Sequence, residues 1–267
     1  MFRRKISRIG RGTLEAGRAA AELARVAAAT LGGAVFGYWR GKRPKREIAR
    51  QLYFVGNRSL LFVLTTLGFV GMVMVYQTCL LTTQVVDGRN QVGAQWARLL
   101  VLDVGPSLTA MMLATRVGAG IAAEIGSMKV TEQIDALRMS GVTPVSYLIV
   151  PRFFACIAMS VVLTMFGMAA AWGAGGLTGY YSFHINPRIF FDLGMVKPSF
   201  AIVGMIKAVA FGAAIPIVSG FCGLRARGSS EGVGAATTAA VIGSSFAVIV
   251  LDFAISWIGM VMLGASA

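Results

Sequence analysis

The sequence predicts an all-α integral membrane protein, because the chain is strongly apolar and holds five long stretches with very little charge. Of its 267 residues, 56% are Ala, Val, Ile, Leu, Met, Phe, Trp, Tyr or Cys and only 13% are charged. The mean hydropathy is +0.72. A soluble domain carries about 25% charged residues. This composition excludes a soluble enzyme, a disordered chain and a small scaffold held together by disulfides.

The five stretches are each long enough for one transmembrane helix, which needs roughly 20 mainly apolar residues. Together they predict a five-helix transmembrane domain over residues 51–267, preceded by an N-terminal unit over residues 1–50. The expected spans are 56–80, 100–123, 147–180, 199–223 and 236–263. The connecting loops that follow from these spans are 82–99, 124–146, 181–197 and 225–235.

The net charge of +14 comes mainly from the N-terminal unit, which holds 13 Lys and Arg against three acidic residues. A basic chain of this kind is often a nucleic-acid-binding protein. Here the basic segment directly precedes the first span, and positive residues flanking a span mark its cytoplasmic side. We therefore expect a cytoplasmic N-terminus, an external C-terminus after five spans, and no nucleic-acid partner.

Charged residues in the N-terminal unit recur at alternating spacings of four and three, which places them on one stripe of a helix. A basic amphipathic helix in the membrane interface is expected, with an ordinary cytosolic helix as the alternative. Residues 26–39 are uncharged but too short to span the membrane, so a re-entrant elbow is expected there. The stripe consists of Arg4, Arg8, Arg11, Glu15, Arg18, Glu22 and Arg25.

The loop between the second and third spans is predicted to contain a short helix at about 131–140, parallel to the membrane. Thr131 is a candidate N-cap, Gly141 suits the C-terminal stop, and Pro144 follows as a helix breaker. With apolar residues on one face and acidic residues on another, such a helix suits docking of a cytosolic partner. The alternative is a plain connecting helix.

Four charged residues fall at membrane depth, where an unpaired charge is costly, so they should face the bundle interior or water. We predict an ion pair between Lys207 and Asp252, across the fourth and fifth spans. These charges either hold helices together or form a gating or proton-sensitive element. The four are Asp103, Arg116, Lys207 and Asp252.

A long central motif, GPSLTAMMLATRVGAGIAAEIGSMKVTEQIDALRMSGVTPVSYLIVPRFFA at 105–155, resembles the signature region of MlaE/YrbE-type permeases. These are the membrane subunits of ABC transporters associated with MCE proteins. Shorter stretches are similar to the same family: RQLYFVGNRSL, GFVGMVMVYQ, IKAVAFG and VLDFAIS. The resemblance covers about residues 45–262.

This resemblance implies a homodimer in a bacterial inner membrane that moves phospholipid between the inner and outer membranes. It also implies three kinds of protein partner: a cytosolic ABC ATPase, an external ring of MCE domains and, in many systems, a STAS-domain protein. The ATPase is expected to dock on the helix at 131–140 through a set of charged residues. That set is Glu124, Lys129, Glu132, Asp135 and Arg138.

The resemblance further implies residues near the lipid cavity and positions where relatives carry charge within the membrane. Lys207 and Asp252 match such charged positions. Asp103 also matches an acidic position, but Leu102 stands where relatives have arginine, so the arginine–acid pair of relatives is not expected here. The expected cavity residues are Met74, Gln77, Leu80, Leu81 and Val104.

No catalytic residue, metal site or cofactor is assigned to this chain. It has no phosphate-binding G-x-x-x-x-G-K-[ST] loop, so ATP and Mg²⁺ are expected on the partner ATPase. Its cysteines, Cys79, Cys156 and Cys222, lack metal-ligand spacing, and His184 is its only histidine. Two other classes remain as alternatives: an ion-coupled secondary transporter, and an intramembrane lipid-modifying enzyme, for which no nucleophile or metal cluster is found.

Overall fold

The computed structural model describes residues 17–34, 45–85, 92–192 and 197–264, and these residues are almost entirely helical. Five of the helices are long and apolar enough to cross a membrane, which confirms the predicted all-α membrane fold. Three of these are single elements: α2 (Lys45–Val85), α9 (Pro198–Leu224) and α10 (Ser230–Gly264).

The other two long helices contain π-helical turns, labelled η, within a continuous helical path. The second runs through α3 (Val92–Leu99), η2 (Leu100–Val104), α4 (Gly105–Leu113), η3 (Ala114–Gly118) and α5 (Ala119–Val130). The third runs through η4 (Val145–Ile149) and α7 (Val150–Phe183). Two short helices lie between the long ones: α6 (Gln133–Met139) and α8 (Pro187–Phe190).

Most long helices extend beyond the spans predicted from hydropathy. The second helix covers 92–130 instead of 100–123, so much of two predicted loops is helical. The turn between α9 and α10 is only five residues, 225–229, because α10 begins at Ser230. A hydropathy window finds only the segment in hydrocarbon, whereas backbone hydrogen bonding continues the helix into the polar interface.

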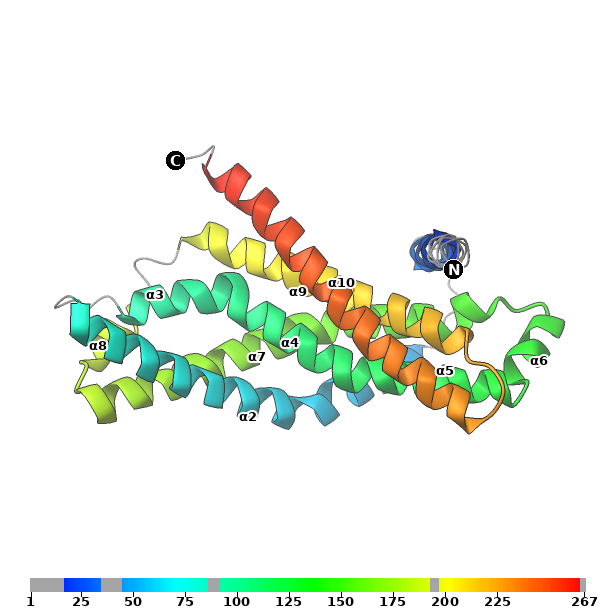
Figure 1. The fold of residues 1–267 in the computed structure, drawn as a ribbon, viewed down its shortest axis with the longest axis horizontal. Helices are drawn as coiled ribbons and strands as arrows, with labels where there is room; N and C mark the ends of the chain where they lie inside the picture. The colour runs from blue at the N-terminus through cyan, green and yellow to red at the C-terminus, as the bar shows by residue number, and fades with distance from the viewer. Residues whose placement is uncertain (1–16, 35–44, 86–91, 193–196, 265–267) are drawn as a thin grey trace, which may run out of the picture.

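The long helices form an elongated bundle with α6 at one end and α8 at the other (Figure 1). Helix α2 packs along α7, α7 packs against α9, and α10 crosses α9 and α5 obliquely. The C-terminal part of α10, red in Figure 1, diverges from the other helices near the α8 end. We refer below to the α6 end and the α8 end of the bundle.

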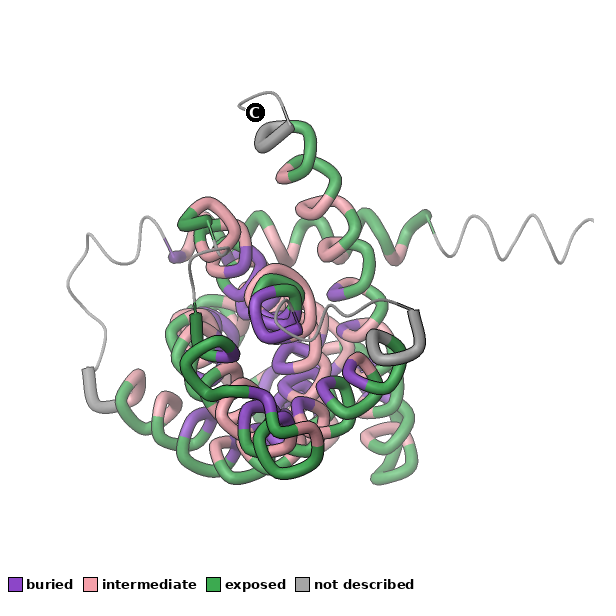
Figure 2. The backbone as a smooth tube through the Cα atoms, turned by 90° about the vertical axis from the view of Figure 1, so that its left-hand side faces the viewer, coloured by how far each residue is buried: buried purple, intermediate pink, exposed green. Residues whose placement is uncertain are grey.

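Buried residues gather along the inside of the bundle and exposed ones around it (Figure 2). The largest buried cluster joins α5, α7, α9 and α6, and includes Ile125, Ile134, Leu163 and Phe211. Many large apolar side chains face outward, as expected of a bundle that has lipid as its solvent. Leu61, Phe69 and Phe246 are 74%, 65% and 67% exposed.

A separate helix over residues 17–34 lies across the α6 end, perpendicular to the bundle's long axis (Figures 1 and 2). Its charged residues Arg18, Glu22 and Arg25 are exposed, while Thr30 and Ala34 are buried. Ala34 packs with Val150 and Phe153 of α7. The amphipathic helix is thus present, and it continues through 26–34, where an elbow was expected; the rest of that stretch and of the stripe lies outside the described residues.

Candidate functional site

A buried lysine binds two carboxylates inside the bundle. Lys207 of α9 has no exposed surface, and its Nζ lies 3.0 Å from Asp252 Oδ1 of α10. Its Nζ also pairs with Asp103 of η2. The ion pair predicted between Lys207 and Asp252 is therefore present, and Asp103 completes a cluster that joins three long helices. We call Asp103, Lys207 and Asp252 the ionic cluster.

Two serine hydroxyls donate to the same carboxylate oxygens that pair with Lys207. Ser107 donates a hydrogen bond to Asp252 Oδ1 at 2.9 Å, and Ser256 donates one to Asp103 Oδ1 at 3.3 Å. Neither serine was predicted, although each lies four residues from one of the two aspartates and so shares its helix face. That spacing could have identified them.

The π turn η2 sets the position of Asp103. Pro106 is the second residue of α4, and only Gly105 separates it from the end of η2. Proline has no backbone N–H and its ring clashes with the carbonyl four residues earlier in a regular α-helix. The wider turn over Leu100–Val104 comes just before it, and the N–H of Gly105 bonds to the carbonyl of Leu100. Such turns are frequent at functional sites.

One ammonium serves two carboxylates, so the ionic cluster carries a net charge of −1 when both acids are ionised. The aspartate side chains are 41% and 29% exposed, whereas the lysine is fully enclosed. An arrangement of this kind holds helices in register and can also bind a proton or a cation. The geometry alone is compatible with both the structural and the gating interpretation.

Arg116 does not face the bundle interior, and of the two predicted surroundings, bundle interior or water, only water stays open for it. It lies in η3, where Ala114, Val117 and Gly118 are buried while Thr115 and Arg116 are exposed. The side of η3 that packs on α10 is thus formed by small and apolar residues. No ion pair of Arg116 occurs among the described residues.

Helix α6 projects from the end of the bundle as a short, mostly exposed helix. It covers Gln133–Met139 rather than 131–140, and Glu132, with φ of 60°, stands at its N-cap. Thr131 is not the N-cap, because its hydroxyl donates to the carbonyl of Ser127 in the preceding turn. Gly141, with φ of +76°, ends the helix as predicted. Pro144 starts the next long helix at its N-cap.

Two kinds of contact brace α6 against α5. Ile134 is completely buried in the main cluster. Lys129 of α5 lies 2.8 Å from Asp135 Oδ2, and Arg138 lies 3.4 Å from Asp135 Oδ1. The hydrogen bond and charge of Lys129, with the charge of Arg138, hold the pKa of Asp135 below its usual value. Glu132, Arg138 and Met139 are left exposed for a partner.

Glu124, one of the predicted docking residues, forms an ion pair with Arg152, which was not among the predicted residues. Its Oε1 lies 2.6 Å from Nη2 of Arg152 in α7. The Arg152 side chain is only 4% exposed. The signal was present in the sequence, since a lone arginine within an uncharged run must find an acid nearby.

The residues expected near a lipid cavity lie apart from the groove described below. Met74, Gln77, Leu80 and Leu81 are exposed on α2, while Val104 packs against a buried cluster that includes Trp96 and Leu100. Their contact with lipid stays a prediction.

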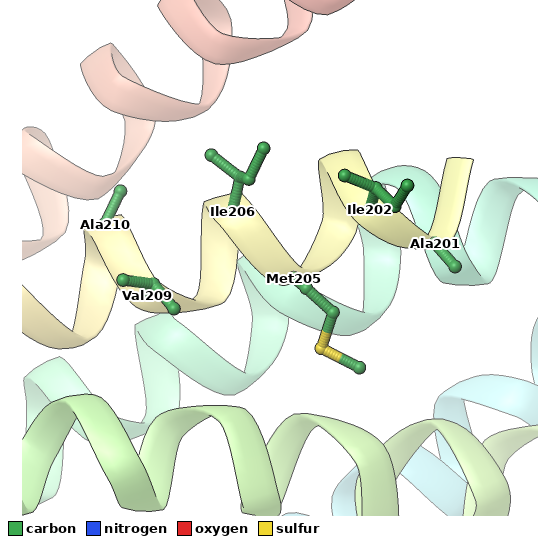
Figure 3. Close-up of a pocket in the computed structure, with 6 residues that line it drawn as sticks. All are labelled: Ala201, Ile202, Met205, Ile206, Val209 and Ala210. Carbon is green, nitrogen blue, oxygen red and sulfur yellow. The ribbon is translucent and has the colours of Figure 1, made fainter. Parts of the chain in front are cut away.

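An open apolar groove of about 520 Å³ runs along α9 instead. Figure 3 shows its lining, in which Ile206 and Met205 leave α9 on opposite sides. The lining residues are Ala201, Ile202, Met205, Ile206, Val209 and Ala210.

A five-span helical bundle with a buried ionic cluster and a short projecting helix defines a multi-pass membrane protein of the permease class. The chain belongs to the family of the permease MlaE, whose model matches residues 48–258.

Its relatives include bacterial and plant membrane proteins. It is 36% identical to a probable ABC transporter permease protein of Synechocystis, over 87% of this chain and 89% of the relative. It is 34% identical to the intermembrane phospholipid transport system permease protein MlaE of Haemophilus influenzae, over 86% and 90%. It is 33% identical to the chloroplastic protein TRIGALACTOSYLDIACYLGLYCEROL 1 of Arabidopsis thaliana, over 81% and 62%.

Proposed function

We propose that this chain is the permease subunit of an ABC transporter that moves phospholipid between the inner and outer membranes of a bacterium. The observation that carries the proposal is α6, an exposed helix braced on the bundle end of an MlaE-family permease. Family membership supports phospholipid as the cargo, because one relative is named for intermembrane phospholipid transport. ATP is then hydrolysed on a partner ATPase with its Mg²⁺, and this chain contributes no catalytic residue.

The α6 end of the bundle is cytoplasmic in this proposal. The basic residues of the N-terminal unit favour that side by the positive-inside rule. The helix over residues 17–34 supports it, because it lies across the same end with its arginines outward, where anionic headgroups would meet them. The α8 end is then external and faces the ring of MCE domains.

Lipid moves through a cavity that two copies of the chain form together. The α9 groove supports this step, because its lining is apolar and it is open on one side. A second copy would close it into an enclosed apolar site of the kind that binds acyl chains. When the ATPases close on ATP, they push α6. The two copies of the chain then shift between two conformations, because the ATP-bound and ATP-free ATPases favour different ones. A STAS-domain protein would bind the ATPase.

The proposal predicts that changing exposed positions of α6 releases the ATPase. Glu132→Lys with Met139→Asp alters two exposed side chains, of which Met139 is 91% exposed, so the bundle should fold normally. We expect co-purification of the ATPase to fall about tenfold or more, the scale of losing a few key contacts at an interface. Phospholipid transfer in proteoliposomes should fall with it.

Glu231→Lys is the matched control, because Glu231 is an exposed acid at the same end but lies in α10. It should bind the ATPase like the wild type. Retention of the ATPase by the α6 variant would place the docking site elsewhere. Absence of an ATPase from the wild-type preparation, together with transport driven by an ion gradient, would instead favour a secondary transporter that uses the ionic cluster.

A further inference from the structure

The Arg152–Glu124 pair lies at the base of the loop that carries α6. Glu124 lies in the middle of α5 and Arg152 in the first turn of α7, so the chain between them completes α5, forms α6 and returns through η4. Arg152 Nη2 and Glu124 Oε1 are 2.6 Å apart. The pair therefore joins the outgoing and returning ends of this loop.

The burial of Arg152 is not explained by a gain in the stability of the fold. Its side chain is 4% exposed, and its Nη1 has no hydrogen-bond partner among the described residues. Its partner Glu124 is 49% exposed, so the cost of desolvation falls on the guanidinium, and the unsatisfied nitrogen adds to that cost. A charged pair at this place favours a role in fixing geometry.

The other described contacts of the loop join α6 to the bundle and do not include a second ion pair between α5 and α7. Ile134 anchors α6 in the apolar cluster that also holds Ile125 and Ile149, and Lys129 ties α6 to α5. Apolar contacts have no direction, so packed helices can slide over one another. A charge-assisted hydrogen bond has a defined length and angle. Among these described contacts, only the Arg152–Glu124 pair holds α5 to α7 in this way.

We propose that Arg152 is a positioning residue that, through Glu124, clamps α5 to α7 so that a displacement of α6 moves the second and third long helices together. Without the clamp, a displacement of α6 would move α5 alone, and α7 would keep its position. The transport consequence rests on the proposed function, in which an ATPase pushes α6. The clamp itself is a property of this chain and can be measured without any partner.

The decisive variant is E124L/R152M, because it replaces the pair by apolar side chains and leaves no buried charge that would prevent folding. The matched control is K129M/D135L, which removes the other ion pair of the same loop. In both backgrounds, spin labels at Ser127 on α5, which is exposed, and Phe166 on α7, which is 55% exposed, report the distance between these two helices. The labelled full-length protein is measured in lipid nanodiscs.

We expect the Ser127–Phe166 distance distribution to broaden in E124L/R152M and to keep its wild-type width in K129M/D135L, because the Lys129–Asp135 pair joins α5 to α6 and not to α7. With the ATPase present, E124L/R152M should bind it and hydrolyse ATP, while phospholipid moved per ATP falls about tenfold, as for residues that modulate coupling between sites. The single variant R152K keeps the positive charge, so it should move more phospholipid per ATP than E124L/R152M.

An unchanged distance distribution in E124L/R152M would overturn the clamp. So would a wild-type number of phospholipids moved per ATP, or a loss of ATPase binding in step with transport. A wild-type protein that binds no ATPase would overturn the proposed function instead, and the distance measurement would still decide on the clamp.

Discussion

Replacing Lys207 with methionine should be among the most destabilising single changes in this protein. The lysine has no exposed surface and pairs with both aspartates, so its loss leaves two carboxylates without a cation within the membrane-spanning part. Removing one partner of a buried pair costs about 3–5 kcal/mol. We expect the free energy of unfolding, measured by titrating the purified protein with SDS in mixed micelles, to fall by about this amount.

The triple variant D103N/K207M/D252N separates lost pairing from lost packing. It removes every charge of the ionic cluster while asparagine keeps hydrogen-bonding capacity toward Ser107 and Ser256. We expect it to regain most of the stability that the single change loses. A triple variant as unstable as K207M would show that the shape of the lysine, rather than its charge, holds the three helices together.

Gly71→Ala should separate α2 from α7 although it adds a single methyl group. A Cβ at this position would overlap the carbonyl oxygen of Ala171 and lie 2.8 Å from its Cα. Backbone atoms cannot rotate away as a side chain does, so the helices themselves must shift. Overpacking of this kind costs about 1–3 kcal/mol. The midpoint of heat-induced unfolding in detergent should fall accordingly.

Gly68→Ala is the matched control on the same helix, one turn earlier. Its Cβ would find only the Cβ of Ala174, at 3.9 Å, which is ordinary contact. We expect no loss, and a small gain from the higher helix propensity of alanine. If Gly71→Ala unfolds at the wild-type midpoint, the close approach of α2 and α7 is not needed for stability.

The sequence was sufficient to predict the five spans and one contact within the site. Hydropathy reports the spans directly, and Lys207 and Asp252 are opposite charges at membrane depth in consecutive spans. Asp103 could not be assigned to the same cluster, because the π turn around it shifts the helix face relative to a regular 3.6-residue period. The side of the helix that Arg116 takes was not predictable for a related reason, since η3 is also wider than an α turn.

Contacts between distant parts of the chain were not predictable from local sequence. Glu124 was placed with the docking residues because it lies near α6 in sequence, and its place there stays a prediction. Only the return of the chain at Arg152 reveals its partner. Thr131 has the side chain of an N-cap, but α5 continues to Val130 and its last turn takes that hydroxyl. The α9 groove depends on how α10 diverges, which local sequence does not encode.

The π turn before Pro106 makes the length of the second long helix as important as its composition. A π turn holds one more residue than an α turn for the same backbone closure. Deleting one residue other than Asp103 within 100–104 would therefore let the helix close as a regular α-helix with little change of face on either side. The same deletion in α4, outside the π turns, would rotate one part of the helix against the other by about 100° and turn either Asp103 away from Lys207 or the small residues of η3 away from α10. Related permeases should therefore tolerate a missing residue within the π turn more readily than elsewhere in this helix.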